Sequence, residues 1–202
     1  FLDNKATDVL RFAALGTTLE AELDRYILGK TADLTRAVEA AMDRLDIPGA
    51  CASFAPFIEA LNNWYIRRSR ERFWKGEKDA DKRAAYDTLY TVLVTMTRTL
   101  APFLPLLTDH IHRALTGESV HLQDWPKAEA FAVDRALVER MDLAREVTSA
   151  AASLRTAKNL RNRLPLRKLT VAHPRHAVLG PLRDVIADEA NVKEVVFADD
   201  PK

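Results

Sequence analysis

The chain has 202 residues, of which 48% are hydrophobic and 29% charged, as is typical of a globular protein with an apolar core. Its formal net charge of +1 at pH 7 provides no global field that would attract a polyanion. The single cysteine excludes a disulfide framework and a thiolate metal cluster, and because no apolar run approaches about 18 residues, no membrane span is predicted.

The N-terminal part predicts a short lead-in segment followed by a long helix. The chain begins at Phe1 without a methionine or a signal-peptide pattern, so we expect a cytoplasmic piece of a longer protein. Residues 1–16 match no clear pattern. A capping box, Thr17-x-x-Glu20, then opens an amphipathic helix. Its inward face is predicted to carry Leu19, Leu23, Ile27, Leu34, Val38, Met42 and Leu45.

Two further helices are predicted before residue 101. Pro48 suits the first turn of a helix and the apolar spacing then continues, so one helix is predicted from about Pro48 to Trp74. Asp79 or Asp81 begins a third helix, which Pro102 ends because proline cannot continue the hydrogen-bond ladder. Its inward residues are predicted to be Tyr86, Leu89, Leu93 and Leu100.

The rest of the chain predicts two more helices and then a change of character. The fourth helix ends at Gly117, a favoured C-cap residue, and residues 118–132 form a loop in which Trp125 is assigned a structural role. The predicted helices are Leu106–Leu115 and about Val133–Asn159, and a strand, a helix and a strand follow at residues 164–171, 178–187 and 192–198.

Together these elements predict a mainly α fold, an antiparallel bundle of four or five helices followed by a small β-α-β appendage. The predicted domains are the lead-in at residues 1–16, a helical domain at residues 17–163 and an α+β subdomain at residues 164–202. Because the appendage is too small to be expected to fold alone, we expect it to dock on the bundle.

The second predicted helix ends in an arginine-rich stretch, residues 62–74. Placing each residue 100° after the last gathers Asn63, Arg67, Arg70 and Trp74 on the face away from the core. Guanidinium groups bind phosphates in a bidentate way, and an exposed aromatic ring gives an unpaired base a surface to stack on. This face is therefore a candidate RNA-binding site. The alternative is a solvated charged face with Trp74 packed beneath a neighbouring loop.

Other side chains of this stretch fall on the side of the apolar residues. Tyr65, Arg68 and Arg72 are predicted to serve structure, with the arginines either extending their heads to solvent or pairing with acids of a neighbouring helix. Trp64 is a second candidate for stacking on a base.

A second basic run, residues 151–168, holds six basic residues and no acid. Arg155, Lys158 and Arg161 or Asn162 recur at spacings of three and four, which predicts one ridge at the end of the fifth helix. The functional interpretation is non-specific contact with phosphates along an RNA stem. The alternative is a set of cations near a helix C-terminus that face water.

No metal site or catalytic constellation is predicted. His110 and His112 are two positions apart on a helix and point to different sides, and His173 and His176 lie in a loop without a second pair of ligands. Cys51 is predicted to be an inert, partly buried residue. The sequence contains no glycine-rich phosphate loop.

Four segments of the chain match one known family in the right order. The first is Asn62-Asn63-Trp64-Tyr65-x-Arg67-Arg68-Ser69-Arg70-x-Arg72-Phe73-Trp74. The others are Ala101-Pro102-Phe103-Leu104-Pro105, Val120-His121-Leu122-x-Asp124-Trp125-Pro126 and Glu189-x-Asn191-Val192-Lys193-Glu194-Val195. Over roughly residues 23–200 the chain thus resembles the anticodon-binding domain, with the start of the C-terminal region, of class I isoleucyl-tRNA synthetases. The first segment is the specific one, because the valine enzymes carry a WYIE-type sequence in its place.

The resemblance implies a helical bundle of the class I synthetase anticodon-binding type, which would hold the anticodon stem-loop of tRNA(Ile) for ATP-dependent aminoacylation. In that family the reaction, with its ATP and Mg²⁺, belongs to a Rossmann-type domain whose HIGH-like and KMSKS-like motifs are absent here. We therefore expect this chain to hold no catalytic residue, metal or cofactor. Its expected partners are the tRNA and the catalytic domain of the parent enzyme. The expected RNA-binding residues are Asn63, Trp64, Arg67, Arg70, Trp74, Arg155, Lys158 and Arg161.

Two alternatives stay open at the level of sequence. One is the equivalent domain of a valyl-, leucyl- or methionyl-tRNA synthetase. The other is a helical protein-interaction bundle whose arginines bind acidic partners. Competition by tRNA carrying an isoleucine anticodon, compared with other tRNAs, separates these readings.

Overall fold

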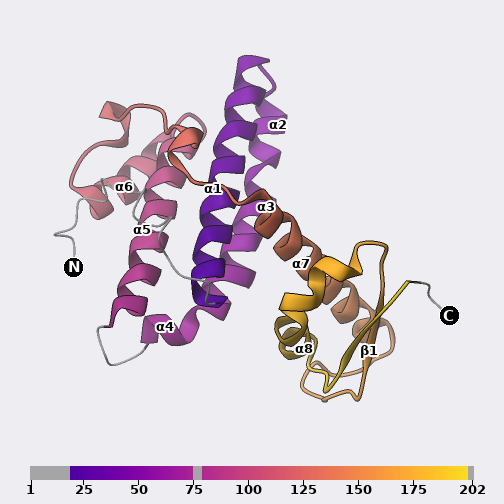
Figure 1. The fold of residues 1–202 in the computed structure, drawn as a ribbon. Coiled ribbons are helices and arrows are strands. Elements are labelled where there is room, and N and C mark those ends of the chain that lie inside the picture. Colours follow the sequence, from indigo (N-terminus) through magenta and orange to yellow (C-terminus); the bar gives the residue numbers. More distant parts are fainter. Residues whose placement is uncertain (1–18, 75–78, 200–202) are drawn as a thin grey trace. The chain divides into compact units, whose positions relative to one another are not determined.

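The structure is a computed structural model that describes residues 19–74 and 79–199, with side chains from residue 22. The described residues are mainly α-helical, with one two-stranded sheet, as predicted (Figure 1). They fall into two compact units, which meet in sequence between Arg135 and Ala136. The predicted lead-in segment, residues 1–16, lies outside the described residues, and so does Thr17 of the predicted capping box.

The first unit is a helical bundle built around its first helix. Its elements are α1 (Leu19–Asp43), α2 (Ile47–Ala52), α3 (Phe54–Glu59), the π-helix η2 (Ala60–Ile66), α4 (Arg70–Trp74), α5 (Ala80–Leu100), α6 (Pro105–Thr116) and the 3₁₀ turns η3 (Val120–Leu122) and η4 (Ala128–Ala130). α1 packs against α2, α3, η2, α5 and η4, while α4 and α6 pack against α5. The run from α2 to η2 returns antiparallel to α1 (Figure 1).

α1 ends earlier than the sequence pattern indicated. Its predicted inward residues Leu23, Ile27, Leu34 and Val38 are buried. The helix ends at Asp43 because Leu45 adopts a left-handed conformation, with a φ of 58°, and its N–H bonds back to the carbonyl of Met42. Leu45 is therefore 84% exposed, and the prediction that it faces the core was wrong.

The second predicted helix is a run of short helical pieces. The Asp46 carboxylate caps its start by accepting the N–H of Gly49 at 2.9 Å. A Cβ at position 49 would lie 2.0 Å from a carboxylate oxygen of Asp46, so this close approach requires glycine. The run is interrupted at Ser53, widens into η2 and ends at Trp74. Cys51, predicted to be partly buried, is exposed.

α5 begins at its predicted cap but buries a different face. The Asp79 carboxylate accepts the N–H of Lys82 at 2.7 Å. The predicted inward residues are only half-buried, and the buried face is instead Ala85, Thr88, Thr91, Val92, Thr95, Thr97 and Thr99. Threonine is tolerated there because its hydroxyl can donate to the preceding turn, as that of Thr91 does to the carbonyl of Asp87 at 2.8 Å.

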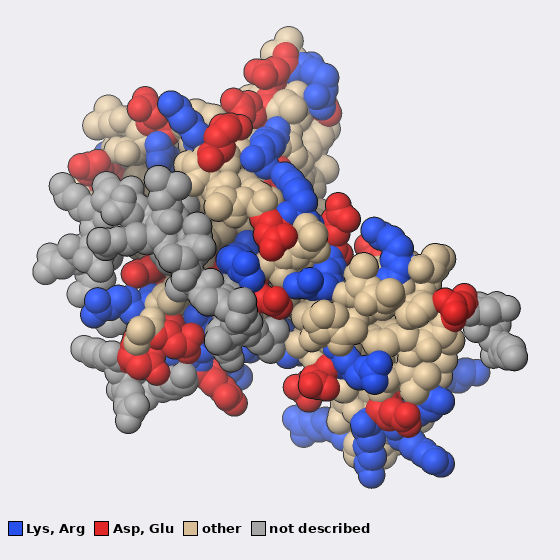
Figure 2. All heavy atoms as spheres, in the orientation of Figure 1, with Lys and Arg blue, Asp and Glu red and all other residues tan. Residues whose placement is uncertain are grey.

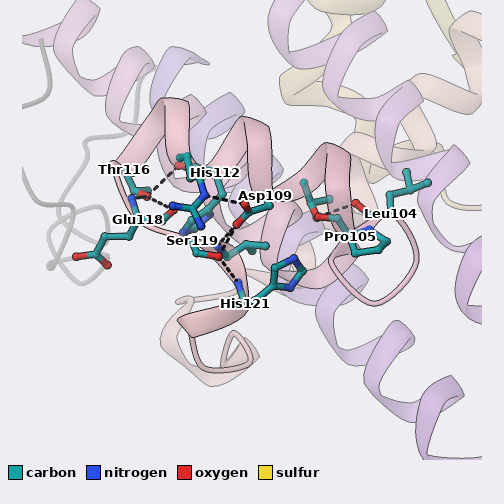
Figure 3. A network of polar contacts seen from close by, with 11 residues as sticks. Leu104, Pro105, Asp109, His112, Thr116, Glu118, Ser119 and His121 are labelled. Atoms are coloured by element: carbon teal, nitrogen blue, oxygen red, sulfur yellow. Dashed lines mark hydrogen bonds and ion pairs between the residues drawn. The ribbon is translucent and has the colours of Figure 1, made fainter.

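α6 and the loop after it are held together by Asp109 (Figure 3). One Asp109 carboxylate oxygen accepts the Ser119 hydroxyl at 2.5 Å and the Val120 N–H at 3.0 Å. The other accepts Nε of Arg113 at 2.7 Å, and this bond is the main cause of a pKa for Asp109 lowered to about 2. The helix ends at Gly117, as predicted, in a left-handed conformation with a φ of 82°.

The second unit contains the β-α-β arrangement predicted for the C-terminal part. Its elements are α7 (Arg135–Ala157, from its second residue), β1 (Leu169–Ala172), the 3₁₀ segment η5 (His176–Leu182), α8 (Arg183–Ala190) and β2 (Val195–Ala198). β1 pairs in parallel with β2, with Leu169 opposite Val195. Buried apolar side chains of η5 and α8, Leu179, Leu182, Val185 and Ile186, form its core.

The boundary between the compact units lies at the start of α7, whereas the sequence predicted a domain boundary after Arg163. α7, predicted as the last helix of the bundle, therefore belongs to the second unit. Within the second unit, the side chain of Arg155 joins the end of α7 to the carbonyls of Leu164 and Ala190.

Candidate nucleic-acid interface

The inward side of the arginine-rich stretch is a buried ion pair. Arg72, 5% exposed, donates from its two terminal nitrogens to the two carboxylate oxygens of Asp24, at 2.9 and 2.7 Å. Its Nε donates to Asp81 at 2.8 Å. Burial alone would lower the pKa of Arg72, but the hydrogen bonds and charge of Asp24 outweigh it and raise that pKa. Of the two alternatives predicted for Arg72, the structure shows the pairing with acids of neighbouring helices.

Tyr65 completes this buried cluster. Its hydroxyl donates to the Asp24 carboxylate at 2.8 Å and lies 3.2 Å from the carbonyl of Ala85. Burial, followed by the charge of Asp24, raises the pKa of Tyr65 well above its usual value, so the hydroxyl stays protonated. The ring of Phe73 packs edge-on against those of Tyr65 and Tyr86, at 6.4 and 5.2 Å between centroids. η2 and α4 are thereby fixed to α1 and α5.

The opposite side presents the predicted outward face, Asn63, Arg67, Arg70 and Trp74, and all four side chains are exposed. Trp74 is 78% exposed, so the alternative in which it packs beneath a neighbouring loop does not hold for the described residues. Nε of Arg67 donates to the carbonyl of Asn63 at 2.9 Å, which holds this guanidinium along the helix surface. The face thus combines two guanidinium groups, one amide and one indole.

Trp64 does not belong to this face. Its side chain is 3% exposed, so its ring is not available to a base and the expectation of stacking there is corrected. The reason is its spacing, three residues after Leu61 and seven after Phe57, which places it with the core. The half-buried Arg68 places its guanidinium carbon 5.4 Å from the centroid of the Trp64 ring, a cation–π contact consistent with a structural role.

Trp125, also assigned to structure, is half-buried in the loop between η3 and η4. Arg98 of α5 fixes that loop, because its Nε donates to the carbonyl of Asp124 at 2.9 Å.

The predicted basic ridge on α7 is not formed. Arg155 is 5% exposed and binds backbone carbonyls, so it is a structural residue and not an RNA contact. α7 ends at Ala157, and Lys158 and Arg161, both exposed, lie in the following loop. The prediction failed because the helical spacing was extended past the residue where the helix ends.

The acidic partners Asp24 and Asp81 were missed as site residues. A signal was present for Asp24, which lies in the first predicted helix directly after the inward Leu23, where an acid is costly to bury without a partner. Within the described ranges, no group of three His, Cys, Asp or Glu side chains gathers as metal ligands. None of the described helices is long and apolar enough to cross a bilayer.

The chain matches a family model described as the anticodon-binding domain of tRNA ligase over residues 24–170. The matched range begins at Asp24 and includes the whole outward face.

Three relatives illustrate the similarity at the level of whole sequences. The chain is 52% identical to the isoleucine–tRNA ligase of Corynebacterium efficiens over 179 residues, which is 88% of this chain and 17% of that protein. It is 54% identical to that of Mycobacterium tuberculosis over 178 residues, again 88% of this chain and 17% of the other. It is 49% identical to the isoleucine–tRNA ligase of Leifsonia xyli subsp. xyli over 189 residues, which is 93% of this chain and 17% of that protein. The chain therefore spans 17% of the length of the curated relatives it matches.

Proposed function

The chain belongs to the family of anticodon-binding domains of tRNA ligases, and from this premise we propose that it binds the anticodon stem-loop of tRNA(Ile) as part of an isoleucine–tRNA ligase. The specificity for isoleucine is supported by the identity of 49–54% to isoleucine–tRNA ligases. In the parent protein, other domains would join isoleucine to the far end of the tRNA with ATP and Mg²⁺, in the cytoplasm. This region would position the tRNA for that reaction.

The observation that carries the proposal is the exposed face of η2 and α4. Unstacked bases of an RNA loop bind to aromatic faces, and guanidinium groups hold phosphates or base edges. Trp74 is assigned the stacking surface, Arg67 and Arg70 the phosphates or base edges, and Asn63 one base edge through its paired donor and acceptor. The buried pair of Arg72 and Asp24 fixes the helix that presents these groups.

The test is binding of the chain to transcripts of isoleucine and valine tRNAs, and to an isoleucine transcript that carries the valine anticodon. We expect preference for the isoleucine anticodon, and a loss of about 1–3 kcal/mol of that binding in Trp74→Ala and in Arg70→Ala. Matched controls are Leu106→Ala, an apolar side chain that is 87% exposed, and Arg44→Ala, an exposed arginine after α1.

The controls should bind as the unaltered chain does, and far-UV circular dichroism should be unchanged in all four variants. Preference for the valine transcript would instead assign the chain to a valine enzyme. Equal, weak binding to every transcript, indifferent to Trp74→Ala, would overturn the proposal.

A further inference from the structure

The loop after α7 carries exposed cations in a segment without acids. Residues 147–183 contain no Asp or Glu. The exposed basic residues of the loop are Lys158, Arg161, Arg163, Arg167 and Lys168, here called the cationic loop. Within the described part of the chain, none of these five forms an ion pair. Figure 2 shows Lys and Arg side chains gathered at this end of the second unit. The loop therefore presents basic side chains that no carboxylate of its own segment pairs with, so they are available to an anionic partner.

The backbone of this loop is held from inside by Arg155. One terminal nitrogen of its buried guanidinium donates to the carbonyls of Arg161 and Leu164, at 3.1 and 2.9 Å. The other donates to the carbonyls of Ala190 and Asn191, at 2.8 and 2.9 Å. All four of these partners are neutral carbonyls, so the Arg155 guanidinium joins the loop to the end of α8.

Asn191 fixes the same loop from the other side. It adopts a left-handed conformation, with a φ of 49°, and its side-chain amide donates to the carbonyl of Asn162 at 2.9 Å. The N–H of Leu166 donates to the Asn191 carbonyl at 3.0 Å, and the N–H of Lys193 donates to the Leu166 carbonyl at 2.9 Å. Loop carbonyls at positions 161, 162, 164 and 166 are thus occupied by the protein, while the basic side chains remain at the surface.

We propose that the cationic loop binds the sugar-phosphate backbone of the tRNA, independently of base sequence, and that Arg155 is the positioning residue that holds the loop in its binding shape. This inference rests on the proposed function and adds to it a second contact surface with a different role. Unpaired guanidinium and ammonium groups suit phosphate contacts, which carry no sequence information. A loop that is ordered before binding avoids the entropy of ordering on binding.

The surface is tested by the salt dependence of binding. We compare a triple variant, Arg163→Ala, Arg167→Ala and Lys168→Ala, with a control that removes the same charge from the first unit, Arg44→Ala, Arg83→Ala and Lys127→Ala. Each lost phosphate contact reduces the slope of log K against log salt by about 0.7–0.9, so the loop variant should have a slope shallower by about 2. The control should keep its slope. Equal slopes in both would overturn the proposal.

Arg155 is tested by Arg155→Met, with Arg155→Lys as the conservative variant. Arg155 is buried and would not touch the tRNA itself, but Arg155→Met removes its bonds to the loop carbonyls. This variant should therefore weaken tRNA binding and reduce the slope of log K against log salt. Arg155→Lys should recover part of both. A folded Arg155→Met protein with an unaltered slope would contradict the positioning role. If Arg155→Met does not fold, Arg155→Gln takes its place in the comparison, and a folded Arg155→Gln protein with an unaltered slope would contradict the role equally.

The two proposals fail in different ways. Loop variants should leave the preference for the isoleucine over the valine transcript unchanged, because they touch phosphates only. Loss of that preference belongs to the face that contains Trp74, whereas a reduced salt slope with the preference intact belongs to the cationic loop.

Discussion

Arg70 and Arg72 are two residues apart on one short helix and have opposite environments. Arg72→Lys keeps the charge but cannot reproduce the fork that holds Asp24 and Asp81, so we expect a loss of about 2 kcal/mol in the free energy of unfolding. Arg70→Lys should change that free energy by less than about 0.5 kcal/mol, since Arg70 is exposed, and should instead weaken tRNA binding. Urea unfolding and tRNA binding are measured for both variants, and we expect the larger loss of stability in Arg72→Lys and the weaker tRNA binding in Arg70→Lys.

Asp24 is the centre of the buried cluster, because both Arg72 and Tyr65 donate to it. Asp24→Ala leaves a buried guanidinium with only its contact to Asp81, and should cost about 3–5 kcal/mol. The comparison is Asp33→Ala, which removes partly exposed ion pairs to Arg36 and Arg135 and should cost less than about 1 kcal/mol. Similar midpoints of urea unfolding for the two variants would show that the cluster does not stabilise the fold.

His112 gives the stability a defined pH dependence. It is buried, with Nδ1 2.9 Å from the hydroxyl of Thr97, and burial followed by the charge of Arg98 lowers the pKa of His112. The unfolded chain therefore takes up this proton first as pH falls below about 6.5, and stability is lost from there downward. The contribution of Asp109 begins to be lost only at lower pH, between about 4 and 2.

The check is the free energy of unfolding at pH 7.5 and 5.5. We expect it to be lower at pH 5.5, and the difference to shrink in His112→Gln. An unchanged difference in that variant would assign the pH dependence to other groups.

The sequence predicted the environment of some residues of the arginine-rich stretch and not of others. Arg72 and Tyr65 follow the apolar spacing and are buried, while Arg70 and Trp74 are exposed, as expected. Composition misled at Trp64, since an aromatic beside arginines was given a binding role although its spacing was that of a core residue. RNA contact by the outward face stays a prediction until binding is measured.

At the scale of elements, the order of the helices, the inward face of α1 and the end of α6 were predicted, while the face of α5 and the ends of α1 and α7 were not. α5 buries a face shifted by about one residue, Thr88, Val92 and Thr99 in place of Leu89, Leu93 and Leu100. Hydrophobicity alone could not indicate this, because a buried threonine can donate its hydroxyl within its own helix, as Thr99 does to the carbonyl of Thr95.

The end of α6 allows a test of backbone conformation alone. A Cβ at Gly117 or at Gly180 would meet no atom within 4 Å, but only Gly117 has a positive φ. Gly117→Ala should therefore cost about 1 kcal/mol, whereas Gly180→Ala should be close to neutral. Urea unfolding of both variants checks this, and an equal cost would mean that the left-handed conformation at residue 117 is not what requires glycine.

At the scale of the whole molecule, the sequence predicted a mainly α fold with a β-α-β appendage but gave no sign of where the compact units divide. One contact within the second unit is made by the side chain of Arg155, whose spacing on a basic run resembled a solvent-facing ridge. A buried arginine that binds only carbonyls has no pattern in sequence, because its partners are backbone groups that any residue supplies.

Because the net charge of the chain is only +1, binding of RNA can be distinguished experimentally from general attraction to acidic polymers. A bundle that binds acidic partners by charge alone should be displaced from tRNA by polyglutamate as readily as by a competing tRNA at equal total charge. Stacking on Trp74 adds a contribution that polyglutamate lacks, because it has no aromatic base. We therefore expect polyglutamate to compete at least tenfold less well than isoleucine tRNA, and Trp74→Ala to narrow that gap. Equal competition by the two polymers, unaffected by Trp74→Ala, would favour the acidic-partner interpretation instead.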